Sequence, residues 1–443
     1  MHAGLAQGVG RPVGAVKRPP KGGPRRLRNN PTPFGYLVHS AVKGAIGRSL
    51  LRDAAARTRP CHENTGACVV RHRIITLLAA VVTLVSVAGV GAQSGRRIDR
   101  RPFPGTVYTA SNSAAGNAIL LFDRLSDGRL VAAGSIATGG TGTGAGLGNQ
   151  GGLMLTRNER WLLAVNAGSN SLSVFEVRKR GLGLVNVIPT GGSRPISVTE
   201  HGGVVYVVHA NSDNITGFTL GRDGHLQPLI GSVQGLSGTG VGPAQIAFTP
   251  DGDFLLVTEK NTNRIVTFDV DRHGLPTDRR VQDASGVTPF GFAFGKRDQV
   301  IVTEAFGGAP NASATSSYDI GRDGTLTPIS ASVPTGQTAA CWAALTPDGR
   351  FAFVTNTGSG SITGYGIDFD GQIERLDDDG RTGVTGDGST PIDVVITDSG
   401  KYLYSLNSGT HTIGSFRIQS DGSLTALPFA AGLPVGANGL ASR

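Results

Sequence analysis

The chain of 443 residues contains 67 glycines, while only 16% of its residues are charged and 6% aromatic, a composition that fits many short strands joined by tight turns and argues against a helical bundle. Its formal net charge of +9 arises near the N-terminus, because residues 1–92 hold 14 of the 41 Lys and Arg residues and two of the 32 acidic residues. The 27 basic and 30 acidic side chains that remain make residues 93–443 slightly acidic, which removes the main reason to expect nucleic-acid binding.

The N-terminal region divides into three segments. Residues 1–70, which include "KRPPKGGPRRLRNNPTP", are expected to form a disordered basic extension, or to be mis-assigned if translation starts after Met1. Residues 71–92 are interpreted as a signal peptide, because two arginines precede an apolar run that ends in the small residues Val-Gly-Ala. We therefore expect cleavage after Ala92, export to the periplasm or the extracellular space, and a linker over residues 93–104.

An uncleaved membrane anchor is the alternative to cleavage, because the apolar run Ile74–Val90 approaches the length that spans a bilayer. If the segment is cleaved, Cys341 is the only cysteine of the mature chain. No internal disulfide can then form, and stability must come from burial and strand pairing.

A repeated unit fills the rest of the chain. "LTPDGRFAFVTNTGSGSITGYGID" begins at Leu345, and "FTPDGDFLLVTEKNTNRIVTFDVDRHG" at Phe248 and "ITDSGKYLYSLNSGTHTIGSFRIQSDG" at Ile396 match it closely. Each unit predicts a short apolar strand, a tight turn, two alternating strands joined by a polar turn, and a glycine-containing hairpin into a fourth strand. Asp-Gly in the tight turns supplies positive φ at low steric cost.

Seven units are counted from the residue predicted to close the second strand of each. This residue falls, at spacings of 43 to 54, at Asn112, Asn166, His209, Glu259, Glu304, Asn356 and Asn407. Seven units of four strands at this period predict an all-β, seven-bladed β-propeller over residues 105–443. The alternation of period two excludes helical solenoids.

The two ends of the repeat region complement each other. The first unit starts at "TVYTASN" without an innermost strand, and the chain finishes with "LPVGANGLASR", which resembles the run into an innermost strand elsewhere. We therefore predict that Gly439–Ser442 complete the first blade and close the ring, which leaves no open sheet edge.

Common cofactor and nucleophile motifs give no support for a reaction. "GLGNQG", Gly146–Gly151, has the glycine spacing of a dinucleotide-binding loop, but strand-like sequence follows it, so we interpret it as a loop between blades. The sequence contains no nucleophile elbow, H-E-x-x-H motif or phosphate-binding loop. No cofactor is therefore predicted.

Candidate site residues fall in two sets at the mouth of the propeller channel, where loops of all blades converge. The first set leads into the innermost strands and comprises Gln150, Arg194-Pro195, Pro243-Ala244-Gln245, Pro289-Phe290, Ala340-Cys341-Trp342, Pro391-Ile392-Asp393 and Asn438. The second set is the strand-closing residues given above. We predict that Gln245, Trp342, Asp393 and Asn356 bind a ligand.

Three successive strand-closing residues depart from asparagine. His209, Glu259 and Glu304 form one arc of the ring, and a histidine with two carboxylates suits acid–base catalysis or metal binding. The alternative is three independent substitutions without a common task.

The units "AFVTNTGSGSITGY" and "LAVNAGSNSLSVF", which follow "TPDG"-type turns, resemble the repeats of the lactonase family of seven-bladed propellers. That family includes propeller-type 6-phosphogluconolactonases and carboxymuconate-lactonising enzymes. The resemblance implies Arg and His at the positions of Ala244 and Gln245, and Glu at the position of Lys260. The departure removes a cationic partner for an oxyanion, so we hypothesise that Arg194 substitutes for it while Glu259 or His209 activates water.

Three functions follow as expectations. The first is hydrolysis of a sugar-acid or related lactone, with His209, Glu259, Glu304 and Arg194 as catalytic residues. The second is a non-catalytic propeller that binds a protein or a cell-envelope glycan. The third resembles calcium-dependent gluconolactonases and uses a divalent metal held by Glu259, Glu304, Asn356 and Asp393. We expect a monomer that meets a membrane only through an uncleaved signal segment.

Overall fold

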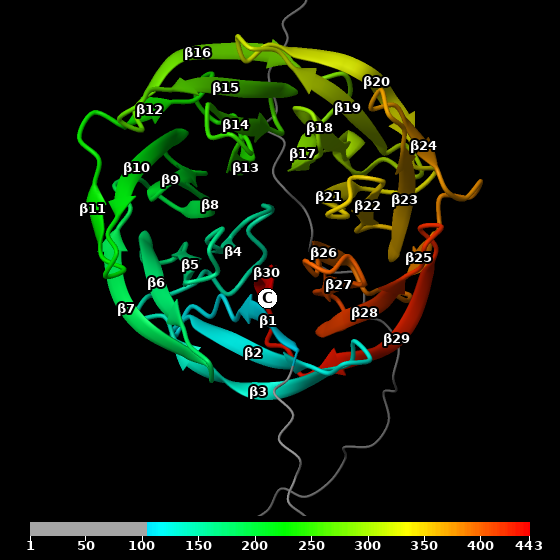
Figure 1. The fold of residues 1–443 in the computed structure, drawn as a ribbon, viewed down its shortest axis with the longest axis horizontal. Coiled ribbons are helices and arrows are strands. Elements are labelled where there is room, and N and C mark those ends of the chain that lie inside the picture. The colour runs from blue at the N-terminus through cyan, green and yellow to red at the C-terminus, as the bar shows by residue number, and fades with distance from the viewer. Residues whose placement is uncertain (1–103) are drawn as a thin grey trace, which may run out of the picture. The chain divides into compact units, whose positions relative to one another are not determined.

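The computed structural model describes residues 104–443, and the predicted basic extension, signal segment and cleavage site lie outside these residues. The described part forms a ring of seven antiparallel sheets, which we number as blades 1 to 7 in chain order (Figure 1). Its one short 3-10 helix is Phe306–Gly308. Within residues 104–443, no helix has the length and hydrophobicity needed to cross a membrane.

The strands of the first four blades come first along the chain. Blade 1 holds β1 (Gly105–Ala110), β2 (Ala118–Arg124), β3 (Leu130–Ala137) and the final strand β30 (Asn438–Ser442). Blade 2 holds β4 (Leu153–Leu155), β5 (Trp161–Asn166), β6 (Ser171–Val177) and β7 (Leu182–Pro189). Blade 3 holds β8 (Pro195–His201), β9 (Val204–His209), β10 (Asn214–Leu220), β11 (Leu226–Pro228) and β12 (Gln234–Gly235). Blade 4 holds β13 (Pro243–Phe248), β14 (Phe254–Glu259), β15 (Arg264–Val270) and β16 (Pro276–Asp283).

The remaining strands form the other three blades. Blade 5 holds β17 (Pro289–Phe294), β18 (Gln299–Glu304), β19 (Ala314–Ile320) and β20 (Leu326–Pro334). Blade 6 holds β21 (Ala340–Leu345), β22 (Phe351–Asn356), β23 (Ser361–Ile367), β24 (Ile373–Arg375) and β25 (Gly383–Val384). Blade 7 holds β26 (Pro391–Ile396), β27 (Tyr402–Asn407), β28 (Thr412–Ile418) and β29 (Leu424–Ala431).

The tight turn between the first and second strands of blade 4 shows why the repeated Asp-Gly is used. The Asp251 carboxylate accepts a bond from the Thr249 hydroxyl at 2.6 Å and from the Asp253 amide at 3.1 Å. Gly252 follows with φ of +88°, a conformation that glycine adopts without steric cost. A Cβ at Gly252 would also collide with the His201 ring of blade 3. The turn therefore needs glycine for its backbone and for its contact with the next blade.

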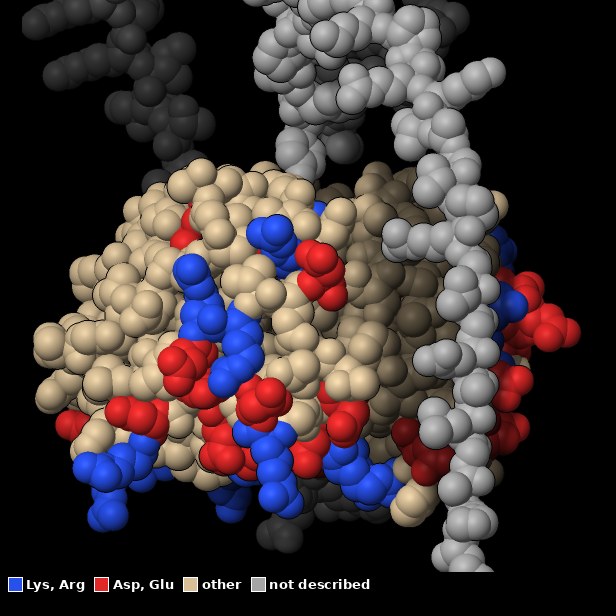
Figure 2. Space-filling view, turned by 90° about the horizontal axis from the view of Figure 1, so that it is seen from above, with Lys and Arg blue, Asp and Glu red and all other residues tan. Residues whose placement is uncertain are grey.

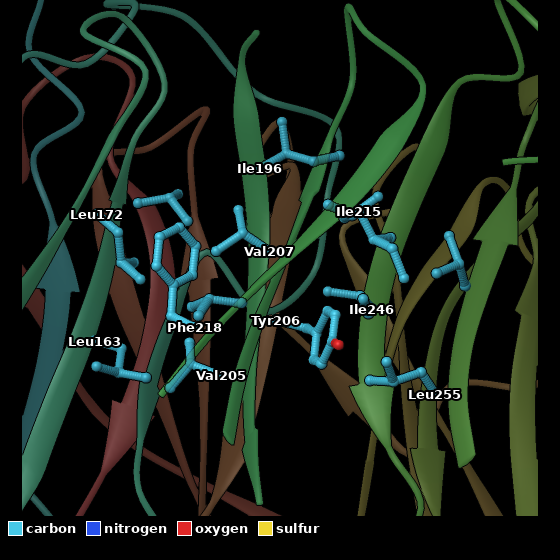
Figure 3. Packing of buried hydrophobic residues seen from close by; sticks show 14 of the residues in the cluster. Leu163, Leu172, Ile196, Val205, Tyr206, Val207, Ile215, Phe218, Ile246 and Leu255 are labelled. Atoms are coloured by element: carbon cyan, nitrogen blue, oxygen red, sulfur yellow. The ribbon is translucent and has the colours of Figure 1, made fainter. Parts of the chain in front are cut away.

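The hydrophobic core lies between neighbouring blades. In the cluster shown in Figure 3, side chains of blades 2, 3 and 4 interdigitate; the labelled members are Leu163, Leu172, Ile196, Val205, Tyr206, Val207, Ile215, Phe218, Ile246 and Leu255. The second strand of each blade is buried on both faces, as in β14, whereas the outermost strand β16 is largely exposed. Burial of such side chains contributes about 1.5–3 kcal/mol each, so the blades stabilise one another.

The last strand closes the ring as predicted. β30 pairs antiparallel with β1, with Val107 opposite Ser442 and Tyr108 opposite Ala441. The pairing continues beyond the strand, because the Arg443 amide donates to the Thr106 carbonyl at 2.9 Å. The C-terminal strand is thus the innermost strand of blade 1 (Figure 1).

The outermost strands of blades 3 and 6 depart from the expected four-strand pattern. In each blade two short segments pair with the third strand: β11 and β12 with β10, and β24 and β25 with β23. In blade 3 the gap is bridged by Ser232, whose hydroxyl accepts the Gly217 amide at 2.9 Å. The edge of β10 therefore stays hydrogen-bonded despite the interruption.

The two faces of the ring differ in charge. We define the loop face by the connections between second and third strands and by those that lead from one blade to the next. Of the charged residue types Lys, Arg, Asp and Glu, these connections contain only Arg194, Asp213, Lys260 and Asp387 within the described residues. We define the hairpin face by the turns between first and second strands and between third and fourth strands, nearly all of which carry Asp, Glu, Lys or Arg. The segments that interrupt the outermost strands of blades 3 and 6 belong to neither set. Figure 2, an edge-on view, shows these side chains gathered toward one side of the ring.

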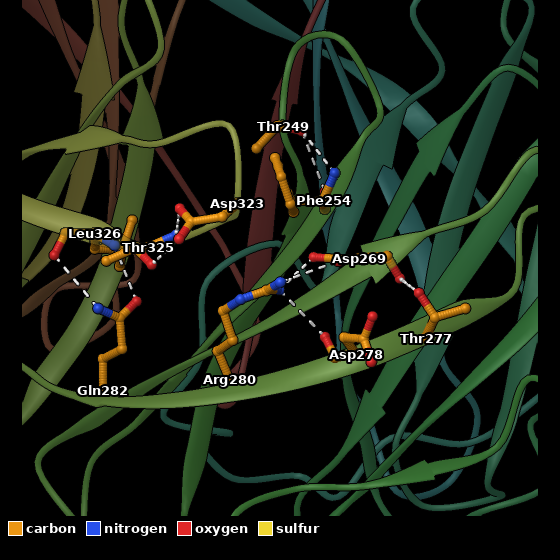
Figure 4. Close-up of polar contacts among 10 residues, drawn as sticks. All are labelled: Thr249, Phe254, Asp269, Thr277, Asp278, Arg280, Gln282, Asp323, Thr325 and Leu326. Atoms are coloured by element: carbon orange, nitrogen blue, oxygen red, sulfur yellow. Dashed lines mark hydrogen bonds and ion pairs between the residues drawn. The ribbon is translucent and has the colours of Figure 1, made fainter.

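Polar contacts link neighbouring blades near the hairpin face. The Gln282 side chain of blade 4 accepts the Leu326 amide of blade 5 at 2.9 Å, and Arg280 forms an ion pair with Asp269 (Figure 4). In the adjoining turn, Asp323 accepts bonds from the amide and the hydroxyl of Thr325 at 3.1 and 2.9 Å. The acidic residues of this region thus shape turns and pair with arginine.

Candidate functional site

The strand-closing residues turn into their own blades. The strand ends at the predicted residue in six blades; in blade 1, β1 ends at Ala110, two residues before Asn112. The loop arriving from the preceding blade covers several of these side chains through a glycine. A Cβ at Gly192 would collide with the ring of His209, and one at Gly286 would collide with the carboxylate of Glu304. Both side chains are consequently buried completely.

The asparagines of this ring hold the third strand of their blade. Asn356 Nδ2 donates to Ser361 Oγ at 3.1 Å and to Thr363 Oγ1 at 2.9 Å. Asn166 makes the corresponding bonds to serines five and seven residues ahead, at 3.2 and 2.8 Å. Asn356, a predicted binding residue, is therefore engaged inside blade 6.

The two glutamates are also held within loops and strands near their own blades. Glu259 accepts bonds from the amide of Ser237 at 2.9 Å, from the Ser237 hydroxyl, and from Thr262 Oγ1 at 2.6 Å. Glu304 accepts the hydroxyls of Ser316 and, at 2.6 Å, of Ser332. Burial raises the pKa of Glu304, and the two serine hydroxyls oppose this shift. Both oxygens of each carboxylate are thus occupied.

His209 differs from the glutamates because one of its polar atoms has no partner. Its Nδ1 lies 3.2 Å from the carbonyl oxygen of Asn214, which can only accept, so Nδ1 carries the hydrogen. Burial lowers the pKa of His209 to about 4, and the ring is neutral at pH 7. Nε2 therefore carries a buried lone pair with no hydrogen-bond partner. Such an imidazole is in the protonation state of a general base.

His209, Glu259 and Glu304 have separate partners on blades 3, 4 and 5. Within residues 104–443, no group of three or more His, Cys, Asp or Glu side chains is placed to hold a metal ion. The oxygen ligands of the divalent-metal alternative likewise lie on four different blades. The three carboxylates accept hydrogen bonds, whereas Asn356 Oδ1 has no partner.

The third residue of several innermost strands ties its blade to the next one. Gln245 accepts the Phe292 amide at 2.7 Å and donates to the Phe292 carbonyl at 3.0 Å. Asp393 accepts the Leu440 amide of β30 at 3.0 Å, and burial raises the pKa of Asp393 to about 7. Two predicted binding residues therefore join blades at the centre of the ring, which we call the hub.

Blade 5 lacks such a residue, because Gly291 stands at the position of Gln245. Gln150 fills the place from across the ring: Nε2 donates to the Ala343 carbonyl at 2.8 Å, and Oε1 accepts the Ala343 amide at 3.2 Å. A Cβ at Gly291 would collide with Oε1 of Gln150. The segment Gly146–Gly152, which we call the strap, thus links blade 2 to blade 6.

A second strap contact involves a predicted binding residue. Trp342 Nε1 donates to the Asn149 carbonyl at 2.7 Å, and the Asn149 side chain accepts from Asn438 of β30 at 3.0 Å. The loop that leads into β4 reaches toward the centre of the ring (Figure 1). The strap, which contains the glycine-rich motif, therefore lies over the hub, and Trp342 holds it there through a hydrogen bond.

Lys260 lies at the rim of the hub, directly after β14. Its Nζ donates to the carbonyls of Gly148 at 2.6 Å and Pro243 at 2.8 Å, and it lies 4.8 Å from the centre of the Phe290 ring. Burial lowers the pKa of Lys260 to about 8; the neighbouring charge of Arg194 adds to this shift, and Cys341 opposes it. Burial raises the pKa of the Cys341 thiol to about 12, so this thiol provides no counter-charge at neutral pH.

Arg194 comes from the loop that covers His209. Its backbone has φ of +59°, and its amide donates to Asn170 Oδ1 at 2.7 Å. Its Nε is buried without a hydrogen-bond partner. The ion pairs of residues 104–443 include neither Arg194 nor Lys260. Arg194 was predicted as a catalytic residue from the sequence, whereas Lys260 was assigned no role. The available signal was that, among residues 104–443, only these two Lys or Arg residues lie in the loop-face connections.

Comparison with known proteins gives the following matches. The family model "Lactonase, 7-bladed beta-propeller" matches residues 116–241, 226–306 and 302–434. A candidate 6-phosphogluconolactonase from Bacteroides fragilis is 19% identical, with a TM-score of 0.62 over 76% of this chain and 98% of its own. A periplasmic gluconolactonase from Pseudomonas aeruginosa is 16% identical, with a TM-score of 0.59 over 75% of this chain and 98% of its own. A protein from Lactobacillus plantarum is 16% identical, with a TM-score of 0.63 over 76% of this chain and 99% of its own. No curated protein matches the chain.

Proposed function

Because the chain belongs to the lactonase family of seven-bladed β-propellers, we propose that it is an exported hydrolase of a sugar-acid lactone or a related lactone. The reaction takes place on the loop face, at the hub rim of blades 3 and 4. The observation that carries this proposal is the ammonium of Lys260, which uses two of its three N–H donors on backbone carbonyls and lies near the unpaired Arg194. These cations replace the one that the family pattern places at Ala244.

The roles follow from the states of the side chains. Water attacks the lactone carbonyl, whose oxygen becomes negative and is stabilised by the cations of Lys260 and Arg194. His209 Nε2 takes one proton from the attacking water and returns it to the ring oxygen as the C–O bond breaks, so lactone and water give one hydroxy acid. Glu259 is less suited to be the base, because hydroxyl and amide donors already occupy both of its oxygens.

Water must be able to reach the His209 ring for this mechanism to operate. The ring is buried beneath Gly192, so the loop Thr190–Arg194 has to move aside during the reaction. The same loop carries Arg194, and its displacement would bring cation and base to the substrate together. We therefore assign this loop the gating step.

Hydrolysis of a panel of aldonolactones tests the proposal. We expect Lys260→Met and His209→Asn to lower kcat/KM by about a hundredfold or more, the usual range for loss of an oxyanion partner or a general base. Lys179→Met, which removes an exposed lysine of the hairpin face, is the matched control and should leave turnover unchanged. Absence of turnover by the wild-type protein, or full activity of His209→Asn, contradicts the proposed mechanism.

The second candidate function is a non-catalytic propeller that binds a cell-envelope glycan or a protein. It is favoured by the neutral loop face and by the burial of His209, Glu259 and Glu304. Binding of envelope glycan without hydrolysis of any lactone would support it. Elemental analysis of the purified protein tests the divalent-metal alternative, and a mature N-terminus at Gln93 would support export.

A further inference from the structure

Arg194 and Lys260 lie on neighbouring blades of the loop face: Arg194 directly precedes β8, and Lys260 donates to the Pro243 carbonyl at the start of β13. Arg194 and Lys260 are the only Lys or Arg residues in the loop-face connections of residues 104–443. The acids of these connections do not neutralise them: Asp213 accepts the Gly240 amide at 2.7 Å, and neither cation takes part in an ion pair of the described chain. Neither cation therefore has an acidic partner within ion-pair distance among the described residues.

Both cations also keep donors that no protein acceptor uses. Lys260 spends two of three N–H groups, on Gly148 and Pro243. Arg194 has a buried Nε without a partner, although buried polar groups are nearly always hydrogen-bonded. Both residues are partly exposed, so a ligand from solvent can reach part of each side chain. These unused donors belong to cations, so they would bind an acceptor with negative charge more strongly than a neutral one.

We propose that Lys260 and Arg194 form a binding site for the carboxylate of a ring-opened sugar acid, and that this site holds the acid more tightly than the neutral lactone. This inference rests on the location of the site in the proposed function, but it does not require catalysis. A lactone presents only a polar carbonyl to the two cations. The acid presents a full charge, whose attraction is strengthened by partial exclusion of water at the rim.

Inhibition by the product follows directly if the protein is also a hydrolase. The acid released by hydrolysis remains opposite Lys260 and Arg194 and competes with the next lactone. A protein that does not hydrolyse lactones would instead be a receptor for sugar acids. In either case the affinity should fall as salt concentration rises, because the cations are partly exposed.

Isothermal titration calorimetry with gluconate, glucono-lactone, glucose 6-phosphate and sorbitol tests the site. We expect gluconate to bind at least tenfold more tightly than glucono-lactone, and sorbitol not to bind. Lys260→Met and Arg194→Met should each weaken gluconate at least tenfold, whereas the hairpin-face control Lys179→Met should not. Lys260→Arg keeps the cation and should retain binding, which separates loss of charge from misfolding; the thermal melting curve of each variant checks the fold.

Several results would overturn the inference. If glucose 6-phosphate binds and gluconate does not, the site recognises phosphate and the proposal is wrong. Equal gluconate affinity in wild type, Lys260→Met and Arg194→Met would also contradict it. The proposed hydrolysis is tested separately. Lactone turnover without inhibition by gluconate would contradict only the acid-binding site. Lys260-dependent gluconate binding without lactone turnover would contradict only the hydrolase function.

Discussion

On the hairpin face, acids and bases meet in exposed pairs such as Asp127 with Arg129, whose contact is 2.7 Å while about half of each side chain is in solvent (44% and 52%). On the loop face, the carboxylates of Glu259 and Glu304 are wholly buried among hydroxyl groups. Exposed pairs are screened by water and contribute little, whereas a buried carboxylate depends on every donor around it. The comparison therefore shows that the location of a charged residue indicates its role better than the number of charged residues on a face does.

The largest effect is expected at the hub behind the loop face. Gln150→Ala removes both bonds to Ala343 and leaves its buried amide and carbonyl unpaired, which should destabilise the protein by about 1–3 kcal/mol for each of the two groups. Denaturant unfolding measures the change. Adding Gly291→Gln should restore much of the stability, because Gln245 makes the same pair of bonds from the equivalent position of blade 4.

The single variant Gly291→Gln is the control for this pair. With Gln150 present, the new side chain collides with it, so this variant should be less stable than the double variant. The strap would have no stabilising role if Gln150→Ala unfolded at the wild-type denaturant concentration.

The next largest effect is the pH dependence of stability that buried His209 should cause on the loop-face side. The pKa of His209 falls from its usual 6.5 to about 4 on folding, so the unfolded chain binds more protons between these pH values. The stabilising contribution of neutral His209 to the unfolding free energy is fully present above pH 6.5. It is lost as pH falls toward 4, which lowers the unfolding free energy by on the order of 3 kcal/mol. His209→Asn should remove that loss, as measured by unfolding free energy across pH 4–8.

Asp393 should change the unfolding free energy with pH in the opposite direction to His209, and it therefore serves as the control. Its pKa rises to about 7 on folding, so its contribution favours folding as pH falls from 7 toward 4. Asp393→Asn should therefore lose more stability at low pH than wild type does. Parallel pH curves for His209→Asn and wild type would show that the buried ring does not couple to folding.

The smallest effect is expected on the hairpin face. Asp127→Asn removes an exposed pair with Arg129 but leaves the turn-forming bond to the Arg129 amide, because the asparagine oxygen still accepts it. The melting temperature should stay within about 1 °C of wild type. A large decrease would show that charges on the two faces matter equally.

The sequence allowed the strand framework to be predicted because its signals are local. Alternating residues and Asp-Gly turns placed the ends of β9, β14 and β22 at His209, Glu259 and Asn356, and β30 was recognised from its likeness to other innermost strands. The split outer strands were not predicted. In blade 3, Pro228 and Gly231 interrupt the outermost strand, and a serine side chain takes over the missing backbone contact.

The arrangement of the site depends on contacts between distant segments, and these have no local signal. His209 is buried because Gly192 of an incoming loop lies over its ring, and Gln150 meets Ala343 across 193 residues of sequence. Lys260 carried a signal only because it is one of two Lys or Arg residues in the loop-face connections of residues 104–443. Residue type thus indicated candidates, whereas burial and partners decided which of them retain unused donors or lone pairs.

The pairing of β30 with β1 also sets an order of events during synthesis. The first three strands of blade 1 emerge from the ribosome long before their fourth strand exists, and β1 must wait with an unpaired edge while six other blades are made. The nascent protein is therefore most vulnerable to intermolecular strand pairing just before residues 438–442 become available.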